Sequence, residues 1–152
     1  MGSQPTPQFA PLEAILALRE TVIIAGTDRD SPYFPGDEAA TTRHIGVFLQ
    51  GRCIGCATLL QTDYDGEPAW QLRGMATEPA FQGQGIGRAI LEFAEHQLLG
   101  EAPSIALLWC NAREQAATFY ERHGWRTVSE RFDIPGVGPH YRMVKRIGTG
   151  TI

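Results

Sequence analysis

The spacing of apolar residues along the chain predicts three helices. In the best defined of them, Ile86, Ile90, Phe93 and Ala94 recur at helical intervals, so one face is apolar and can pack against a core. Glycines directly precede this run, and we expect the helix to begin near residues 85–87. The predicted helices cover residues 11–23, about 86–99 and 112–123.

Local signals support the other two helices. Pro11 is suited to the first turn of the helix over residues 11–23. Gly124 is suited to end the helix over residues 112–123, because glycine adopts the left-handed conformation found just past a helix C-terminus. The shared face of the first helix carries Leu12, Ile15, Leu16 and Arg19.

Shorter apolar runs between turn residues predict six strands. The run at residues 105–110 is continuously apolar, which is typical of a strand buried between helices. Gln50-Gly51-Arg52 predicts a hairpin, and Gly74 inside a strand indicates a bulge or a close approach by another segment. The strands cover residues 44–49, 53–61, 69–76, 105–110, 125–132 and 141–147. This order predicts a mixed α/β sheet with helices on both faces.

The composition is typical of a globular domain. The 152 residues are 43% hydrophobic and 20% charged, and a chain of this length folds most simply as a single domain, here residues 1–152. Residues 1–8 are polar with two prolines, and we expect them to be disordered or at most a short first strand.

Charge and hydropathy restrict the partners. A formal net charge of −4 disfavours nonspecific nucleic-acid binding, which requires a basic face. No apolar run approaches the length of a membrane helix, and no secretory segment opens the chain. We therefore predict a cytoplasmic protein that binds neither nucleic acid nor membrane; nothing in the chain decides between a monomer and a homodimer.

The cysteines and histidines form no metal pattern. Cys53 and Cys56 lie inside a strand pattern, where residues three apart point to opposite faces, and a structural zinc site would need a second ligand pair. His44, His96 and His123 lack metal-ligand spacing with one another. We predict that the cysteines pack in the core and that no metal is bound.

Gly83, Gly85 and Gly87 stand at alternate positions directly before a predicted helix. Such a loop lets successive N–H groups point into one concavity, and the helix N-terminus adds partial positive charge, so the stretch predicts a phosphate or pyrophosphate site. Position 88 is Arg88 rather than the third glycine of a dinucleotide loop, and the Gly-Lys-Ser/Thr of a P-loop is missing.

The stretch Gln82-Gly83-Gln84-Gly85-Ile86-Gly87 resembles the Q/R-x-x-G-x-G/A signature of the GNAT superfamily of N-acetyltransferases, the loop that binds the pyrophosphate of acetyl-CoA. Residues 111–125, NAREQAATFYERHGW, resemble the later N-x(7)-F-Y-x(3)-G-[FW] element of that family. The resemblance spans roughly residues 12–146. It implies a mostly antiparallel central sheet of six to seven strands, with two splayed strands that receive the pantetheine arm of acetyl-CoA.

The resemblance also implies the residues that bind acetyl-CoA. Backbone around Met75, Ala76 and Thr77 would bind pantetheine and polarise the thioester carbonyl. Phe119 would form a wall of the site, with plain core packing as the alternative. Asn111 lies where the family often contacts the cofactor, and with Glu114 it also forms a capping box for the next helix. The pyrophosphate would be held by Gln82, Gly83, Gln84, Gly85, Ile86, Gly87 and Arg88.

Tyr120 aligns with the tyrosine that many relatives use as the general acid toward the CoA thiolate. A phenol with a pKa near 10 suits a donor that stays protonated at neutral pH, and a core tyrosine is the alternative. Several relatives place a basic glutamate on the fourth strand, where this chain has Gln71 and Arg73. His140, Glu67 or a chain of waters could replace it, and His140 is the one expected near the acceptor.

We therefore predict an enzyme that transfers an acetyl group from acetyl-CoA to a primary amine of a small molecule or peptide. The acceptor pocket is expected between the loops 25–42 and 133–140, where Asp28, Asp30, Asp37 and Glu38 could attract a cationic amine. A non-catalytic, acyl-CoA-binding regulatory module is the alternative function. A longer acyl donor or a hydroxyl acceptor is a third possibility on the same fold.

Overall fold

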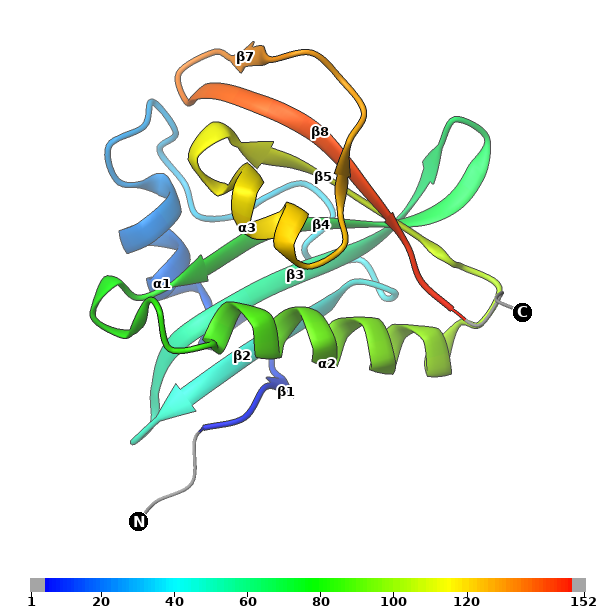
Figure 1. Cartoon of the computed structure of the whole chain (residues 1–152). Coiled ribbons are helices and arrows are strands. Elements are labelled where there is room, and N and C mark those ends of the chain that lie inside the picture. Colours follow the sequence, from blue (N-terminus) through cyan, green and yellow to red (C-terminus); the bar gives the residue numbers. More distant parts are fainter. Residues whose placement is uncertain (1–4, 149–152) are drawn as a thin grey trace.

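The structure, a computed structural model, describes residues 5–148. One sheet of eight strands forms its centre, in the order β1-β2-β3-β4-β5-β8-β6 with β7 paired to β8 (Figure 1). Neighbouring strands are antiparallel except for the parallel pair β4 and β5. The strands are β1 (Gln8–Phe9), β2 (Arg43–Leu49), β3 (Arg52–Tyr64), β4 (Glu67–Thr77), β5 (Leu107–Arg113), β6 (Arg126–Thr127), β7 (Phe132–Ile134) and β8 (Gly138–Arg146).

The helices cover both faces of this sheet, which confirms the predicted fold class (Figure 1). α2 (Ile86–Glu101) packs across β2, β3 and β4, and α3 (Ala117–Arg122) shares its core. α1 (Leu16–Arg19) packs on the opposite face against β3 and β4. A 3₁₀ turn (Leu12–Ala14) precedes α1 and a π turn (Glu20–Ile24) follows it; further 3₁₀ turns are Pro79–Phe81 and Glu114–Ala116.

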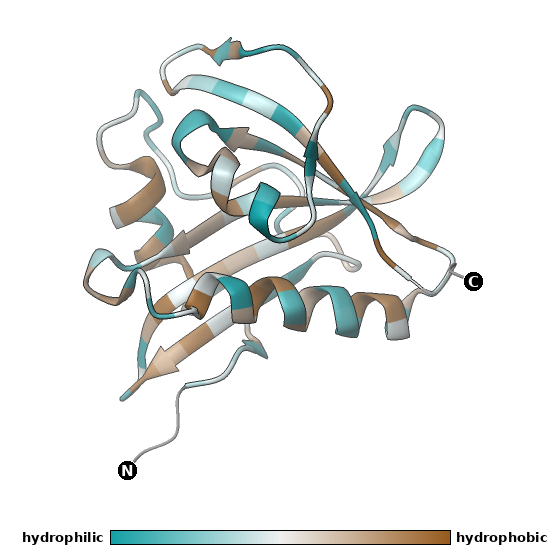
Figure 2. Cartoon of the chain, viewed as in Figure 1, coloured by the Kyte–Doolittle hydropathy of each residue, from teal (hydrophilic) through white to brown (hydrophobic). Residues whose placement is uncertain are grey.

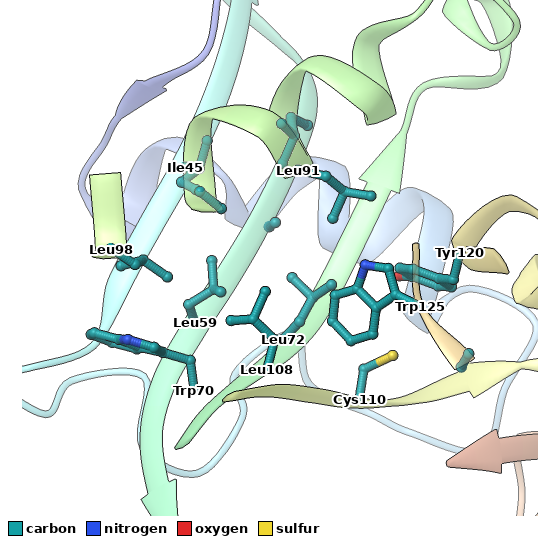
Figure 3. Close-up of a cluster of buried hydrophobic side chains, with 14 of the residues drawn as sticks. Ile45, Leu59, Trp70, Leu72, Leu91, Leu98, Leu108, Cys110, Tyr120 and Trp125 are labelled. Carbon is teal, nitrogen blue, oxygen red and sulfur yellow. The ribbon is translucent and has the colours of Figure 1, made fainter. Parts of the chain in front are cut away.

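The larger core lies between the sheet and α2, where the apolar spacing of the sequence predicts it. Bands of apolar and polar residues alternate along α2 (Figure 2). Figure 3 shows the side chains of this cluster, with Leu59, Trp70 and Leu72 from the sheet beneath Leu91 and Leu98. The buried residues of α2 are Ile86, Ile90, Leu91, Ala94 and Leu98.

Two backbone predictions that rest on glycine are confirmed. Gln50 and Gly51 have φ values of 52° and 79°, which makes the tight hairpin turn between β2 and β3. Gly74 has φ 63° and lies in a bulge, because two residues of β4 oppose the single Ala57 of β3. A Cβ atom at Gly74 would also lie 3.0 Å from Nε of Arg19, so the close approach is present as well.

β4 and β5 diverge after a short stretch of pairing. Only the pairs Trp70–Leu108 and Gln71–Trp109 join them, although β4 continues to Thr77 and β5 continues to Arg113. The facing edges of both strands are therefore unpaired beyond these positions, which is the splayed arrangement that the sequence resemblance implies.

The first predicted helix is one helical segment of three kinds. It changes from a 3₁₀ turn to α-helix and then to a π turn. The 3₁₀ and π turns do not have the 3.6-residue period of an α-helix, on which the predicted apolar face was based. Leu12, Ile15 and Arg19 are buried as predicted, whereas Leu16 is only half buried and Leu18 is buried beside them.

Three predictions between residues 112 and 140 are wrong. β5 continues to Arg113 because it pairs with β8 along its whole length, so helical structure starts at residue 114 rather than 112. The predicted strand over residues 125–132 is interrupted, and only β6 and β7 remain of it. The predicted loop 133–140 is mostly a hairpin of β7 and β8.

The prediction that Cys53 and Cys56 point to opposite faces is also wrong. Val47 pairs with Gly55 and Phe48 with Cys53, so Ile54 has no partner and forms a bulge. The extra residue reverses the alternation, and both thiols join the small core under α1. A hydrogen bond with Cys56 lowers the pKa of the Cys53 thiol.

Candidate functional site

A cavity of about 560 Å³ opens where β4 and β5 diverge. Residues 71–77 of β4 and 110–113 of β5 form its two sides. The long loop after α1 and the hairpin β7–β8 close it, through Arg29, Phe34, Pro35, Ile134, Val137 and His140.

The structure brings together part of the predicted site. The predicted residues that line the cavity are Met75, Ala76, Thr77, Gln82, Asn111, Tyr120 and His140. Those outside its lining are Gly83, Gln84, Gly85, Ile86, Gly87, Arg88 and Phe119. Gln82 joins the two groups, because its side-chain amide donates to the carbonyl of Thr77 at 3.1 Å.

The glycine loop leads into α2 as the sequence predicts. Gly85 is the N-cap residue with φ 86°, and Gly83 has φ 80°. Within residues 5–148, none of the five N–H groups from residue 83 to residue 87 has a hydrogen-bond acceptor. These donors and the positive end of a 16-residue helix are available to a phosphate group.

Gly87 and Phe119 hold the loop close to α3. A Cβ atom at Gly87 would lie 3.0 Å from the ring of Phe119 and 3.5 Å from the methyl group of Met75. Arg88 points away and pairs with Glu92 on the exposed side of α2, at 3.0 Å. The start of α2 therefore packs directly against the wall of the cavity.

Tyr120 is a buried residue in the lining of the cavity. Its ring packs edge-on against Phe119 and against Trp125, which Figure 3 shows beside it. Its hydroxyl donates to the sulfur of Met75 at 3.6 Å. Burial raises the pKa of the Tyr120 phenol well above its usual value, and the nearby Cys110 adds to the rise. The phenol is therefore protonated at neutral pH, and a thioether is a weak acceptor that another group can replace.

The helix around Tyr120 ends as predicted. Gly124 has φ 92°, its N–H donates to the carbonyl of Glu121, and the N–H of Trp125 donates to the carbonyl of Tyr120. These two bonds form a Schellman motif, which fixes Trp125 against the Tyr120 ring.

His140 lies on β8 directly opposite Arg113 of β5 and is 4% exposed. Its Nδ1 lies 2.7 Å from the carbonyl oxygen of Gly138. Because a carbonyl can only accept, Nδ1 carries the proton, and in the neutral ring Nε2 has a free lone pair. Phe132 stacks on the ring at 6.1 Å between centroids and holds its plane.

The predicted capping role of Asn111 is wrong. Arg113 rather than Asn111 is the N-cap residue of the turn that follows β5, and no side chain caps it. Oδ1 of Asn111 instead accepts a hydrogen bond from Nε of Arg142 at 2.7 Å. Asn111 lies on a strand at the cavity, with its side chain held by the neighbouring strand.

The acidic residues of the long loop do not form the expected attraction for a cation. Asp37 is buried and makes two hydrogen bonds with the guanidinium of Arg19, at 2.7 and 2.9 Å. Burial alone would raise the pKa of Asp37, but the bonds from Arg19 and from the N–H of Phe34 lower it below the usual value. Asp28, Asp30 and Glu38 are exposed, and none of them lines the cavity.

Three arginines that sequence reasoning did not assign to the site line the cavity: Arg29, Arg73 and Arg113. Arg73 alternates with Leu72 on β4, so the two side chains point to opposite faces of the sheet. The alternation of Leu72 and Arg73 was the sequence signal that could have assigned Arg73 to the site. It is informative only when the face of the sheet covered by the long loop after α1 is known.

Residues 5–148 contain neither a metal-binding cluster nor a membrane-spanning helix. No group of three or more His, Cys, Asp or Glu side chains is arranged to hold a metal ion there. None of the helices in that part of the chain has the length and apolar character needed to cross a bilayer.

Sequence comparison decides the family. The family model for the acetyltransferase (GNAT) domain matches residues 41–127, which contain the glycine loop and the Tyr120 helix. The chain belongs to the GNAT family of acetyltransferases. The uncharacterized N-acetyltransferase YitI of Bacillus subtilis (strain 168) is 36% identical over 116 residues, which cover 74% of this chain and 76% of YitI.

Solved structures share the fold. ElaA of Escherichia coli superposes with a TM-score of 0.78 at 21% identity, over 94% of this chain and 100% of ElaA. An aminoglycoside 6'-N-acetyltransferase complexed with coenzyme A superposes with a TM-score of 0.73 at 12% identity, over 96% of this chain and 99% of that one. By its family, the chain is a GNAT-type N-acetyltransferase.

Proposed function

We propose that this GNAT enzyme transfers the acetyl group of acetyl-CoA to a primary amine of a small molecule or peptide by direct attack. The observation that carries the proposal is the Tyr120 hydroxyl, a buried, protonated donor at the cavity whose present acceptor is a thioether sulfur. A thiolate leaving group needs such a donor.

The rest of the cavity supports the same reaction. Beyond Gln71 the edge of β4 toward β5 has no strand partner, and Met75, Ala76 and Thr77 line the gap. An extended pantetheine chain could pair with that edge, with its thioester carbonyl polarised by backbone N–H groups. The free N–H groups of residues 83–87 would hold the pyrophosphate, and fixing this remote part would orient the thioester.

His140 is our candidate for the base that deprotonates the amine. Its free Nε2 lone pair and its place in the cavity lining support this role. The strand-four glutamate of several relatives is replaced by Gln71 and Arg73. Glu67, the carboxylate that β4 does carry, pairs with Arg146 at 2.8 Å and lies outside the cavity lining.

A Tyr120→Phe variant tests the proposal. We expect kcat to fall by about 10²–10⁴-fold, the usual contribution of a general acid, while calorimetric titration gives an unchanged Kd for CoA. Tyr64→Phe is the matched control, since its hydroxyl makes no hydrogen bond within residues 5–148 and lies outside the cavity. Full activity of Tyr120→Phe would remove the acid assignment, and CoA binding without transfer to any amine would favour a regulatory module.

A further inference from the structure

Positive charge collects on one side of the cavity. Arg29, Arg73 and Arg113 line it, and none of them forms an ion pair within residues 5–148. The part of the lining that the structure describes contains no Asp or Glu. The whole chain has a formal net charge of −4, so this excess of positive charge is a local property of the cavity.

Neutral carbonyl groups hold two of these guanidinium groups in place. Arg73 donates to the carbonyl of Pro35 at 2.7 Å, and Arg113 donates to the carbonyl of Ile23 at 2.8 Å. A guanidinium has five N–H donors, so most of them remain for a ligand. Burial lowers the pKa of Arg73 and of Arg113. The carboxylate of Asp37 raises the pKa of Arg73, whereas the charge of Arg29 lowers the pKa of both arginines.

The phosphates of CoA are not the anion that these arginines would meet. Arg73 lies over the ring of Phe34, on the face of the sheet that α1 covers. The glycine loop opens on the other face, where Gly87 approaches Phe119 and Met75. The cavity therefore lies between two chemically different surfaces: the free backbone donors of the glycine loop, beyond its lining on one face of the sheet, and the arginines of its lining on the other.

We infer that the acceptor is an amine that also carries an anionic group, held by Arg29, Arg73 and Arg113. This inference rests on the proposed transferase function and specifies its substrate. Arg113 and His140 are direct neighbours across β5 and β8, so the anion would bind beside the group proposed to deprotonate the amine. A planar carboxylate fits the guanidinium fork best, and a phosphate offers the same charge.

Matched amines that differ only in the anionic group test the inference. The first pair is leucine and leucinamide, because Val22, Ile23, Ile134 and Val137 add an apolar lining; the second is O-phosphoethanolamine and ethanolamine. We expect kcat/KM, calculated for the unprotonated amine, to be at least about tenfold higher for the anionic member of a pair, the size of one charge-assisted hydrogen bond. The free-amine correction matters because an amino acid and its amide have different amine pKa values.

Three variants connect the preference to the arginines. Arg73→Gln and Arg113→Gln should each reduce the acid-to-amide ratio about tenfold and leave acetyl-CoA binding unchanged. Arg29→Gln is the variant least able to disturb folding, because Arg29 is exposed and its side chain makes no hydrogen bond within the described part of the chain. A reduced acid-to-amide ratio in this variant therefore reports on the anion site and not on misfolding. Arg126→Gln, an exposed residue outside this cavity, is the control that should keep the ratio.

Calorimetry of leucine and leucinamide with the CoA-loaded protein separates the two claims. Tighter binding of leucine supports the anion site even where no acetyl transfer follows, and that combination would overturn the transferase proposal alone. Preference for O-phosphoethanolamine over leucine would identify the anion as phosphate. Acetyl transfer with equal kcat/KM for both members of each pair, or with spermidine preferred, would overturn the anion site and leave the transferase function standing.

Discussion

Gly74 shows how much of the site depends on one backbone position. Its positive φ lies in the bulge of β4 opposite β3, three residues beyond Gln71, the last residue of β4 that pairs with β5. Its missing side chain leaves room for Arg19 and for Phe34, whose ring a Cβ would approach to 3.1 Å. The same residue thus lines the cavity and lets Phe34 of the long loop pack against β4.

We expect Gly74→Ala to destabilise the protein more than Gly66→Ala does. Gly66 also has a positive φ, of 84°, but a Cβ there would meet nothing within 4 Å, so its substitution measures backbone strain alone, about 1–2 kcal/mol. At Gly74 the overpacking against Arg19 and Phe34 should add about 1–3 kcal/mol. Urea unfolding of both variants measures this difference, and equal losses would show that the contacts at Gly74 relax freely.

At the scale of residues, the sequence predicts the structural role of a residue where few residue types can adopt the required conformation. Gly74 and Gly124 were predicted because few other residues adopt their conformations. The roles of Arg29, Arg73 and Arg113 could not be predicted in the same way. They are far apart along the chain, and most arginines of a folded protein are exposed to solvent. Only the folded structure therefore shows that these three line one cavity.

At the scale of elements, the buried pair of Arg19 and Asp37 joins three segments. Arg19 is the last residue of α1, Asp37 lies in the long loop, and Arg19 also donates to Oγ1 of Thr58 on β3 at 2.7 Å. Both side chains of the ion pair are almost fully buried. The pair therefore sets the position of the loop that supplies Arg29 and Phe34 to the cavity.

We expect Asp37→Asn to reduce the free energy of unfolding by about 3–5 kcal/mol, because it leaves the buried charge of Arg19 uncompensated. Glu38→Gln, an exposed change in the same loop, should alter stability by less than about 0.5 kcal/mol. Chemical denaturation at pH 7 measures both, and a loss at Asp37 no larger than that at Glu38 would contradict the role of the pair.

The same variant predicts a change in the pH dependence of stability. The folded pKa of Asp37 lies below its usual value of 3.8, so its contribution is present above that pH and is lost as the pH falls through the folded value. Asp37→Asn should therefore lose stability less steeply than the unchanged protein below about pH 4. Parallel acid profiles of the two proteins would show that Asp37 is not the group that titrates.

Elements were predicted well where local pattern and tertiary pairing agree. α2 begins at residue 86, inside the predicted window, because the glycine loop and the apolar spacing give the same boundary. α3 was placed too early because Asn111 and Glu114 look like a capping box, whereas pairing with β8 keeps Asn111 in a strand. The bulge at Ile54 is a similar case, since its inserted residue leaves no mark in the pattern.

At the scale of the whole molecule, the sheet consists of two parts joined by little direct pairing. β1 to β4 form one part and β5 to β8 the other, and two residue pairs connect them along β4 and β5. Alternating and apolar patterns predict strands but not where two strands separate. The opening was expected only through the resemblance of the glycine loop and the Tyr120 helix to GNAT enzymes.

This division predicts that acetyl-CoA stabilises the whole molecule, because a ligand between β4 and β5 would contact both parts and bind only the folded chain. At a ligand concentration of about 100 times Kd, linkage gives about 2.7 kcal/mol, which for a chain of this size raises Tm by about 5–11 °C. NAD is the control and should leave Tm unchanged, since the loop has Arg88 where a dinucleotide loop has glycine. Differential scanning calorimetry measures both, and hydrogen exchange should show new protection in β4 and β5 together. Stabilisation with protection confined to the glycine loop would mean that the cofactor binds at the surface and leaves the gap between the strands open.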